Sequence, residues 1–249
     1  MNVAVIIPAR LESERFPRKM LANRTGKPLI QHTWEQAQKA ELVDRVIIAT
    51  DSREVLNAAL QFGAECELTS PRHKSGTDRI AEVAKQIRED IIINVQGDEP
   101  RIDPSHIDKL ARFMLGGPSV RMATLAAPFK HLLHTAHASN VKVVVDVDGK
   151  ALYFSRSVIP YDRDHEGNER PSTYLHHMGV YAYRREFLLK FATMPQGRLE
   201  GLEKLEQLRA IENGYDVYVL EVDYAYEGID TPEQYNWFVV DWRREKRRG

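Results

Sequence analysis

Three short runs of apolar, mostly β-branched residues constrain the fold of this chain more than any other feature. They cover residues 3–7, 46–50 and 91–95, and polar or proline-containing segments follow each of them. Because apolar residues follow one another without alternation, each run is typical of a strand buried on both faces, as in a parallel sheet. Segments with helix-start signals separate them, at Pro28, at Asp51-Ser52 and at Thr77-Asp78. This order predicts a doubly wound α/β core.

The pattern changes after about residue 120. We predict a hairpin from residues 141–145 and 151–154 around Asp148-Gly149, and strands at 64–68, 178–183 and 217–222. Helices are expected from Pro104, over 199–212 and from Pro232 to about 244. Residues 162–170 are polar and predict a loop. With no internal repeat or low-complexity linker, we predict one domain over 1–249, with halves of about 1–120 and 121–249.

Composition narrows the classes of partner. The 249 residues carry a formal net charge of −1, so no global charge attracts nucleic acid or an anionic membrane. The single cysteine, Cys66, allows no disulfide within the chain, and no apolar run approaches the ~20 residues of a membrane span. We therefore expect a cytoplasmic protein with no nucleic-acid partner and no membrane insertion. The basic tail at 243–248 is interpreted as a solvated helix end rather than a nucleic-acid arm.

A cationic loop follows the first predicted strand. Pro8-Ala9-Arg10 closes the strand, and Arg15, Arg18 and Lys19 follow within nine positions. The carboxyl ends of strands are where open α/β sheets bind ligands, and guanidinium and ammonium groups suit a polyphosphate there. The alternative is a solvated, mildly basic surface loop.

Two aspartates are candidates for holding a divalent metal ion. Asp98 lies three positions after the third apolar run, with Gly97 before it, and Asp230 lies in the sequence Gly-Ile-Asp-Thr-Pro-Glu. Magnesium prefers oxygen ligands and takes one or two carboxylates from protein, with phosphates and water completing its shell. Turn chemistry alone also explains Asp98, and helix capping alone also explains Asp230.

Other polar residues point less specifically to chemistry. Ser75-Gly76-Thr77-Asp78-Arg79 opens a helix whose N–H groups favour an anion or a base edge. Arg156 suits a substrate carboxylate or an internal salt bridge, and His177 is more typical of a core histidine. We find no nucleophile elbow, Walker A loop, Gly-x-Gly-x-x-Gly or His/Cys metal spacing, which disfavours α/β hydrolases, P-loop enzymes and dinucleotide oxidoreductases.

Several motifs, taken together and in this order, resemble one known family. They are Ile7-Pro8-Ala9-Arg10, Gly26-Lys27-Pro28, Ala49-Thr50-Asp51, Ser75-Gly76-Thr77-Asp78-Arg79, Asn94-Val95-Gln96-Gly97-Asp98-Glu99-Pro100, Ala151-Leu152-Tyr153-Phe154-Ser155-Arg156, Leu205-Glu206-Gln207-Leu208-Arg209 and Gly228-Ile229-Asp230-Thr231-Pro232-Glu233. The chain resembles the 3-deoxy-manno-octulosonate (Kdo) cytidylyltransferases, or CMP-Kdo synthetases, over its whole length.

The resemblance implies a Rossmann-like nucleotidyltransferase fold, with a mostly parallel central sheet flanked by helices and a smaller sugar-binding and dimerisation lobe. It implies a homodimer that couples CTP to Kdo with Mg²⁺, for lipopolysaccharide synthesis. Nucleotide-binding roles fall on Pro8, Ala9, Arg10, Arg15, Lys19, Ser75, Gly76, Arg79 and Gln96, and catalytic roles on Arg10, Lys19, Asp98 and Asp230, with the two aspartates as metal ligands. Sugar-binding roles fall on Gln96, Arg156, His177, Tyr181, Glu206 and Gln207.

Alternatives to this activity fall in three classes. The first is a cytidylyltransferase for another 2-keto acid sugar, such as 8-amino-Kdo or an N-acylneuraminate. A catalytically silent nucleotide-sugar sensor and a nucleic-acid-binding module are the others. The two metal-type carboxylates argue against the sensor, and only the basic tail supports the nucleic-acid module.

The chain departs from the family pattern in the cationic loop. Where the family commonly has Gly and Pro, this chain has Arg18 and Met20. If the backbone needs a positive φ at residue 18, Arg18 costs about 1 kcal/mol or more relative to Gly. We expect either a loop of different conformation or an added phosphate contact from Arg18.

Overall fold

A computed structural model describes residues 1–164 and 170–247 of the chain. The described residues form two compact units, one of residues 1–108 and 226–247 and the other of residues 109–164 and 170–225. The C-terminal segment therefore belongs with the N-terminal unit and not with the second half in which the sequence placed it. That the whole chain acts as one domain stays a prediction.

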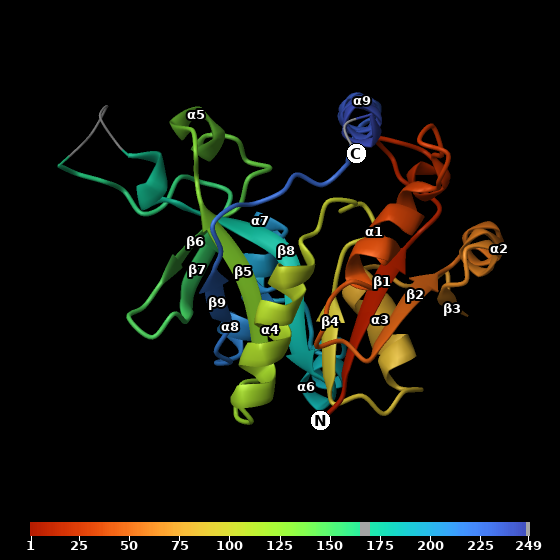
Figure 1. Cartoon of the computed structure of the whole chain (residues 1–249). Helices are drawn as coiled ribbons and strands as arrows, with labels where there is room; N and C mark the ends of the chain where they lie inside the picture. Colours follow the sequence, from red (N-terminus) through yellow and green to blue (C-terminus); the bar gives the residue numbers. More distant parts are fainter. Residues whose placement is uncertain (165–169, 248–249) are drawn as a thin grey trace. The chain divides into compact units, whose positions relative to one another are not determined.

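Four parallel strands form the sheet of the first unit (Figure 1). They are β1 (Val3–Ala9), β2 (Arg45–Thr50), β3 (Glu65–Leu68) and β4 (Ile91–Asn94), in the spatial order β3-β2-β1-β4. Every residue of β1 and β4 is buried, as uninterrupted apolar runs require. This confirms the parallel α/β core predicted from the three runs.

The helices of the first unit are η1 (Lys19–Leu21), α1 (Leu29–Ala37), α2 (Arg53–Gln61), α3 (Gly76–Ala84) and α9 (Pro232–Lys246). Three of the helices in this unit, α2, α3 and α9, begin at a serine or threonine N-cap. The Ser52 hydroxyl accepts from Glu54 N at 3.1 Å, and Ser75 forms a capping box with Asp78. α4 (Pro104–Gly116) begins in this unit and ends in the next.

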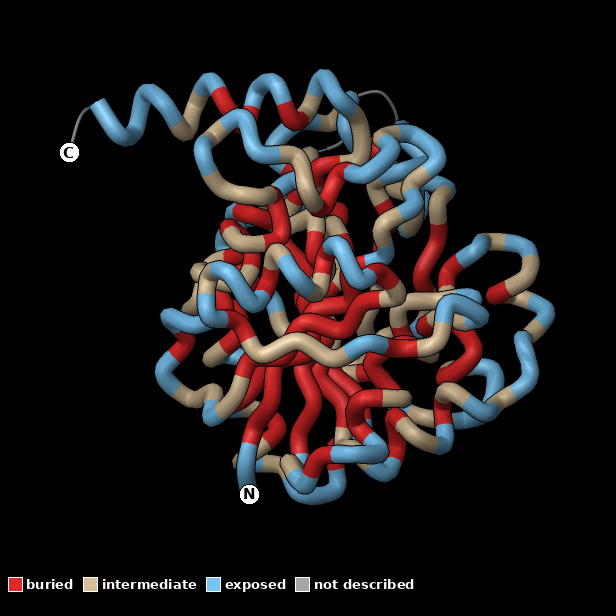
Figure 2. The backbone as a smooth tube through the Cα atoms, turned by 90° about the vertical axis from the view of Figure 1, so that its right-hand side faces the viewer, coloured by how far each residue is buried: buried red, intermediate tan, exposed pale blue. Residues whose placement is uncertain are grey.

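The C-terminal helix is fixed to the first unit by aromatic and aliphatic packing. Tyr235, Phe238 and Val239 of α9 cluster with Leu29 of α1 and with Ile229. Beyond this cluster, most of the helix is exposed, as the pale tube that leads to the C-terminus in Figure 2 shows. Because Ile229 packs in this cluster, the next residue, Asp230, lies in the first unit.

The second unit has its own strands. β5 (Met122–Pro128) pairs antiparallel with β8 (Leu175–Arg184) and parallel with β9 (Tyr218–Glu221). The predicted hairpin is confirmed as β6 (Lys142–Val145) and β7 (Ala151–Ser155). The helical elements are α5 (Leu132–Thr135), η2 (Pro171–Thr173), α6 (Arg185–Phe191), α7 (Arg198–Glu203) and α8 (Leu208–Glu212).

The helical elements α5, η2 and α6 were not predicted, and two further features differ from the prediction. The strand β5 was missed because Met-Ala-Thr-Leu-Ala-Ala-Pro lacks the β-branched run that identified the others. The single helix predicted over 199–212 is wrong, because Lys204 adopts a left-handed conformation with φ 55° and divides it into α7 and α8. Residues 165–169 of the predicted polar loop lie outside the described residues. Within the described ranges, no helix is both long and apolar enough to cross a membrane.

Candidate active site

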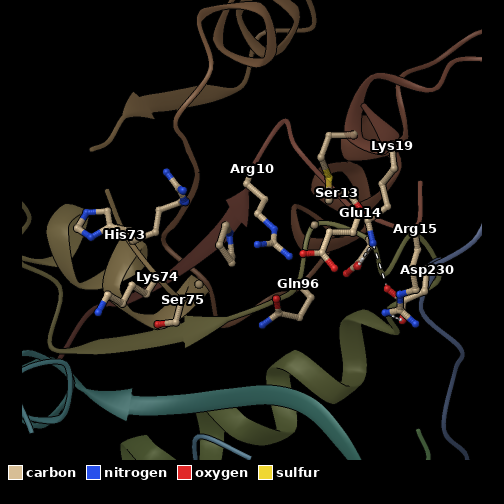
Figure 3. A pocket seen from close by; sticks show the side chains of 16 residues that line it. Arg10, Ser13, Glu14, Arg15, Lys19, His73, Lys74, Ser75, Gln96 and Asp230 are labelled. Atoms are coloured by element: carbon tan, nitrogen blue, oxygen red, sulfur yellow. Dashed lines mark hydrogen bonds and ion pairs between the residues drawn. The ribbon is translucent and has the colours of Figure 1, made fainter. Parts of the chain in front are cut away.

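A polar cavity of about 400 Å³ opens in the first unit, where the chain leaves β1 and β4 (Figure 3). The cavity lies where the carboxyl ends of parallel strands place a ligand. It is lined by Pro8, Arg10, Ser13, Glu14, Arg15, Lys19, Met20, His73, Lys74, Ser75, Gly76, Arg79, Gln96, Gly97, Asp98 and Asp230. In Figure 3, His73, Lys74 and Ser75 lie at one end and Lys19, Arg15 and Asp230 at the other.

Lys19 joins the two predicted metal-type carboxylates. Its ammonium lies 2.5 Å from Asp98 Oδ2 and 3.2 Å from Asp230 Oδ1, and it donates to Ile229 O at 2.9 Å. Lys19 is 6% exposed, so these oxygens replace its water. The aspartates are separated by more than a hundred residues in sequence, yet they share one cation here. A turn at Asp98 or a helix cap at Asp230 would not by itself place the two carboxylates on the same cation.

A second cation extends the cluster. Arg15 Nη2 lies 2.9 Å from Asp230 Oδ2, and both side chains are about half exposed. One Asp230 oxygen thus faces Lys19 and the other faces Arg15, so the carboxylate bridges two cations. Arg10 lines the same cavity, and its side chain points between the two ends in Figure 3. The predicted convergence of Arg10, Arg15 and Lys19 is therefore observed, whereas Ala9 is fully buried in β1 and does not line the cavity.

Arg18 is not part of the cavity. Its backbone is left-handed, with φ 57° and ψ 26°, which is the conformation that the commoner glycine would adopt without strain. Its guanidinium pairs with the exposed Glu54 of α2 instead of facing the cavity. The positive φ on which the strain argument depended is therefore observed, and a phosphate contact from Arg18 stays a prediction. Met20 lines the cavity and packs against Gly97, where a Cβ would come 3.1 Å from Met20 Sδ.

The segment 75–79 forms the other end of the cavity. Gly76 packs closely on Pro8, since a Cβ there would lie 3.3 Å from Pro8 Cγ. Arg79 is 3% exposed, and its guanidinium donates to Thr69 Oγ1 at 2.5 Å and to Asp51 Oδ2 at 2.7 Å. Gln96 lies between the two ends in Figure 3.

Sequence reasoning missed several lining residues. Ser13, Glu14, His73 and Lys74 all reach the cavity, and His73 Nε2 pairs with Glu82 of α3. Lys74 immediately precedes the predicted segment 75–79. A positively charged residue beside a helix start would have indicated that Lys74 also contacts an anionic ligand.

Glu99, next to Asp98, is a further residue that the sequence did not single out. Burial raises the pKa of its carboxyl to about 8, and the neighbouring Asp98 and Asp230 charges add to this effect. The carboxyl group is therefore largely protonated at neutral pH, which keeps a third negative charge away from the aspartate pair.

The predicted sugar-side residues lie in the second unit and are mostly engaged within it. Arg156 donates to three backbone carbonyls: Nε to Glu203 O at 2.7 Å, Nη1 to Ala138 O at 2.8 Å and Nη2 to Lys204 O at 3.4 Å. These bonds tie the end of the hairpin to the break after α7. The structure thus gives Arg156 a role in holding this unit together, and its role toward a sugar stays a prediction.

His177 and Tyr181 project from the same strand. His177 is 8% exposed, its Nε2 lies 3.1 Å from Thr124 Oγ1, and burial lowers its pKa to about 3. A neutral, hydrogen-bonded imidazole of this kind fits the core-histidine interpretation. Tyr181 packs beside it, with 5.4 Å between ring centroids.

Glu206 and Gln207 lie between α7 and α8. Arg209 Nη2 lies 3.3 Å from Glu206 Oε1 and makes its main contacts with the buried Glu200, at 2.8 and 2.6 Å. Gln207 is 4% exposed, and its Nε2 has no hydrogen-bond partner among the residues that the structure describes. A buried amide donor without a partner is costly, so Gln207 is a polar group available to a ligand or a water molecule.

The aspartate pair fits a magnesium ion. Among residues 1–164 and 170–247, no three His, Cys, Asp or Glu side chains form a ready-made metal site. Two carboxylates on one cavity nevertheless match the oxygen ligands that Mg²⁺ takes from a protein when phosphates complete its shell. The Lys19 ammonium between them shows that this position already accommodates a cation.

Comparison with known proteins decides the family. A family model described as cytidylyltransferase matches residues 4–221. The chain belongs to the cytidylyltransferase family. Among curated members, the 3-deoxy-manno-octulosonate cytidylyltransferase of Trichlorobacter lovleyi is 47% identical over 95% of this chain and 96% of its own length. Its namesake in Geobacter sulfurreducens is 46% identical over 93% of this chain and 96% of its own length.

Solved structures agree with this architecture. A CMP:2-keto-3-deoxy-manno-octonic acid synthetase, solved in complex with CTP, superposes with a TM-score of 0.93 at 40% identity, covering 98% of this chain and all of the other. The 4-diphosphocytidyl-2C-methyl-D-erythritol synthase of Anaerococcus prevotii has a TM-score of 0.64 at 11% identity, over 97% and 96% of the two chains, and shares the fold alone. These findings confirm the predicted nucleotidyltransferase fold and enzyme class.

Proposed function

We propose that this protein transfers CMP from CTP to the anomeric hydroxyl of Kdo, releasing pyrophosphate. The observation that carries the proposal is the meeting of Asp98 and Asp230 at Lys19, in a cavity with Arg10 and Arg15. Relatives named for this reaction match more than nine-tenths of the chain, which favours Kdo over other 2-keto acid sugars.

The reaction is an in-line displacement. The hydroxyl oxygen of the sugar forms a bond to the α-phosphorus of CTP, the bond from that phosphorus to the β-phosphate oxygen breaks, and the hydroxyl proton leaves to solvent. Charge repulsion and positioning dominate such barriers, so the protein contributes cations and alignment. Arg10, Arg15 and Lys19 would neutralise the charge that grows on the departing pyrophosphate.

Asp98 and Asp230 would hold the magnesium ion. When bound, the ion supplies Lewis-acid stabilisation of the phosphate charge and lowers the pKa of a coordinated hydroxyl. Arg15 would keep its pairing with the outer oxygen of Asp230 and so orient that carboxylate. The protonated Glu99 would limit repulsion behind the pair.

Recognition of the two substrates would be divided between the two units. Ser75, Gly76 and Arg79 would contact the cytidine, with Pro8 and Gln96 beside them. Gln207, with its unpartnered amide, is the best-supported sugar contact, and Arg156, His177, Tyr181 and Glu206 complete the proposed set.

We also propose that the protein is a homodimer and is located in the cytoplasm. The homodimer is inferred from the family resemblance, and the location is inferred from the single free cysteine.

A substrate panel tests the proposal. The purified protein is incubated with CTP, Mg²⁺ and Kdo, 8-amino-Kdo or N-acetylneuraminate, and products are followed by ³¹P NMR and mass spectrometry. We expect CMP-Kdo and stoichiometric pyrophosphate, with Kdo giving the highest kcat/KM. A clear preference for another sugar would reassign the substrate, and nucleotide binding without turnover on any of them would favour a sensor. UTP in place of CTP is the control for the base.

A further inference from the structure

The motif Ala49-Thr50-Asp51 has no role in the proposed reaction, yet its aspartate joins both ends of the nucleotide cavity. Asp51 lies directly after β2 and is not itself a lining residue. Its Oδ2 accepts from Arg79 Nη2 at 2.7 Å, and its Oδ1 accepts from the backbone N–H of Leu11 at 3.2 Å. Each oxygen therefore serves a different segment of the cavity wall.

The Arg79 side of this link is buried and fixed. The Arg79 side chain is 4% exposed, and its second donor is taken by Thr69 Oγ1, which itself donates to Thr50 O at 2.9 Å. An arginine held in this way has little rotamer freedom, and a charge-assisted bond of this length fixes it further. The orientation of segment 75–79 thus depends on the position of the Asp51 carboxylate.

The Leu11 side of the link controls the cationic loop. Leu11 follows Arg10 directly, and the loop from residue 10 to residue 19 carries every cation at the triphosphate end of the cavity. A second tether of this loop, from Arg18 to Glu54, is exposed on both sides, with side chains 54% and 55% exposed. The exposed tether contributes little, whereas the partly buried one at Asp51 holds the start of the loop.

We propose that Asp51 is a positioning residue that couples the nucleobase end of the cavity to its triphosphate end. A pyrimidine nucleoside that binds segment 75–79 holds that segment in one position, and the rigid Arg79–Asp51 link transmits this restraint to Leu11 and so to the backbone from which Arg10 projects. Cytidine and polyphosphate groups therefore bind with positive cooperativity, although neither touches Asp51. This rests on the proposed function, because it assumes that the cavity binds CTP.

The coupling is measurable with the two halves of the ligand. Calorimetry gives the affinity for inorganic tripolyphosphate with and without saturating cytidine, in the wild-type protein, in Asp51→Asn and in Glu54→Gln. We expect cytidine to tighten tripolyphosphate binding about fivefold in the wild type and in Glu54→Gln, and less than twofold in Asp51→Asn. In Asp51→Asn, the side-chain oxygen still accepts from Leu11 N. The amide nitrogen takes the place of Oδ2, and because it is a donor it cannot accept from the Arg79 guanidinium.

The outcomes separate this inference from the proposed function. Wild-type coupling retained in Asp51→Asn, or absent from the wild type while both fragments bind, overturns the positioning role and leaves the activity standing. Failure of the wild type to bind either fragment or CTP overturns the proposed function as well. If Asp51→Asn does not fold, Asp51→Glu keeps the charge for Arg79 but displaces the carboxylate from Leu11, and the same loss of coupling is expected. With CTP as substrate, the expected signature is a raised KM with a smaller change in kcat.

Discussion

The two units use polar side chains in opposite ways. In the first unit, cations and carboxylates from distant segments meet around an open cavity, and Lys19 bridges Asp98 and Asp230 there. In the second unit, the polar residues expected at the sugar side mostly satisfy internal bonds, as Arg156 does with three carbonyls. Charged side chains that line a cavity indicate function, whereas charged side chains that hydrogen-bond to backbone groups stabilise the fold.

The largest expected effect is on Lys19. Lys19→Met removes the cation shared by the aspartates and one charge from the phosphate end of the cavity. We expect turnover to fall by about two to three orders of magnitude, by analogy with removal of a transition-state donor. Stability should change little, because Asp98 and Asp230 remain partly exposed to water. Steady-state pyrophosphate release measures the turnover of Lys19→Met, and thermal unfolding of the same preparation measures its stability. A large loss of stability would contradict the difference that we draw between the two units.

The opposite result is expected in the second unit at the Glu200–Arg209 pair. Both side chains are about nine-tenths buried, and Arg209 makes two short bonds to Glu200. Glu200→Gln leaves the buried guanidinium with only the longer ion pair to Glu206, at 3.3 Å, and we expect a loss of about 3 kcal/mol of unfolding free energy. Asp216→Asn, at the exposed pair with Lys150, is the matched control and should cost less than about 1 kcal/mol. Equal losses in a urea titration would contradict the burial argument.

Acid should destabilise the second unit through His177. Its pKa is lowered by burial to about 3 in the folded protein, against about 6.5 in the unfolded chain. The unfolded state therefore binds more protons between these values, and stability falls as the pH falls from about 6.5 toward 3. From pH 7 to pH 5 we expect this histidine to cost about 2 kcal/mol.

The contribution is isolated by substitution. His177→Gln should flatten the pH dependence of the unfolding free energy over this window, while His131→Gln, at an exposed histidine, should leave it unchanged. Equal slopes for the wild type and His177→Gln would show that His177 is not held neutral by burial.

The smallest effect is expected at Arg18 in the cationic loop. Arg18→Gly relieves a left-handed backbone and removes an exposed ion pair with Glu54 that is worth little. We expect a gain of up to about 1 kcal/mol, or a few degrees in Tm, with kcat/KM almost unchanged. A marked loss of activity would show that Arg18 reaches the nucleotide.

The sequence predicted the first unit well because its signals are local. Apolar runs identify buried strands, and the polar residues in the loop that follows such a run lie at the carboxyl end of the sheet, as Asp98 does. Local signals could not predict that Asp230 lies close to Asp98, because this depends on the packing of α9 against α1. The motif resemblance supplied that pairing, and hydropathy patterns did not.

The second unit was less predictable because its signals are not local. The strand β5 has no β-branched run, and α7 is divided from α8 at the left-handed Lys204. The residue before it, Glu203, accepts hydrogen bonds from Ser155 Oγ and Arg156 N, which lie almost fifty residues earlier in the chain. Likewise, the sequence left Arg156 with two alternatives, because only the fold shows which carbonyls surround its guanidinium.

The central claim is that Asp98 and Asp230 act on one shared cation during CMP transfer. A double-mutant cycle in pyrophosphate release, with Asp98→Asn, Asp230→Asn and the double variant at saturating Mg²⁺, tests it most directly. If the two carboxylates act as a unit, each single variant loses orders of magnitude in kcat and the double variant is about as slow as the slower single. Multiplicative losses in the double variant, or near-normal turnover in either single, would contradict the account.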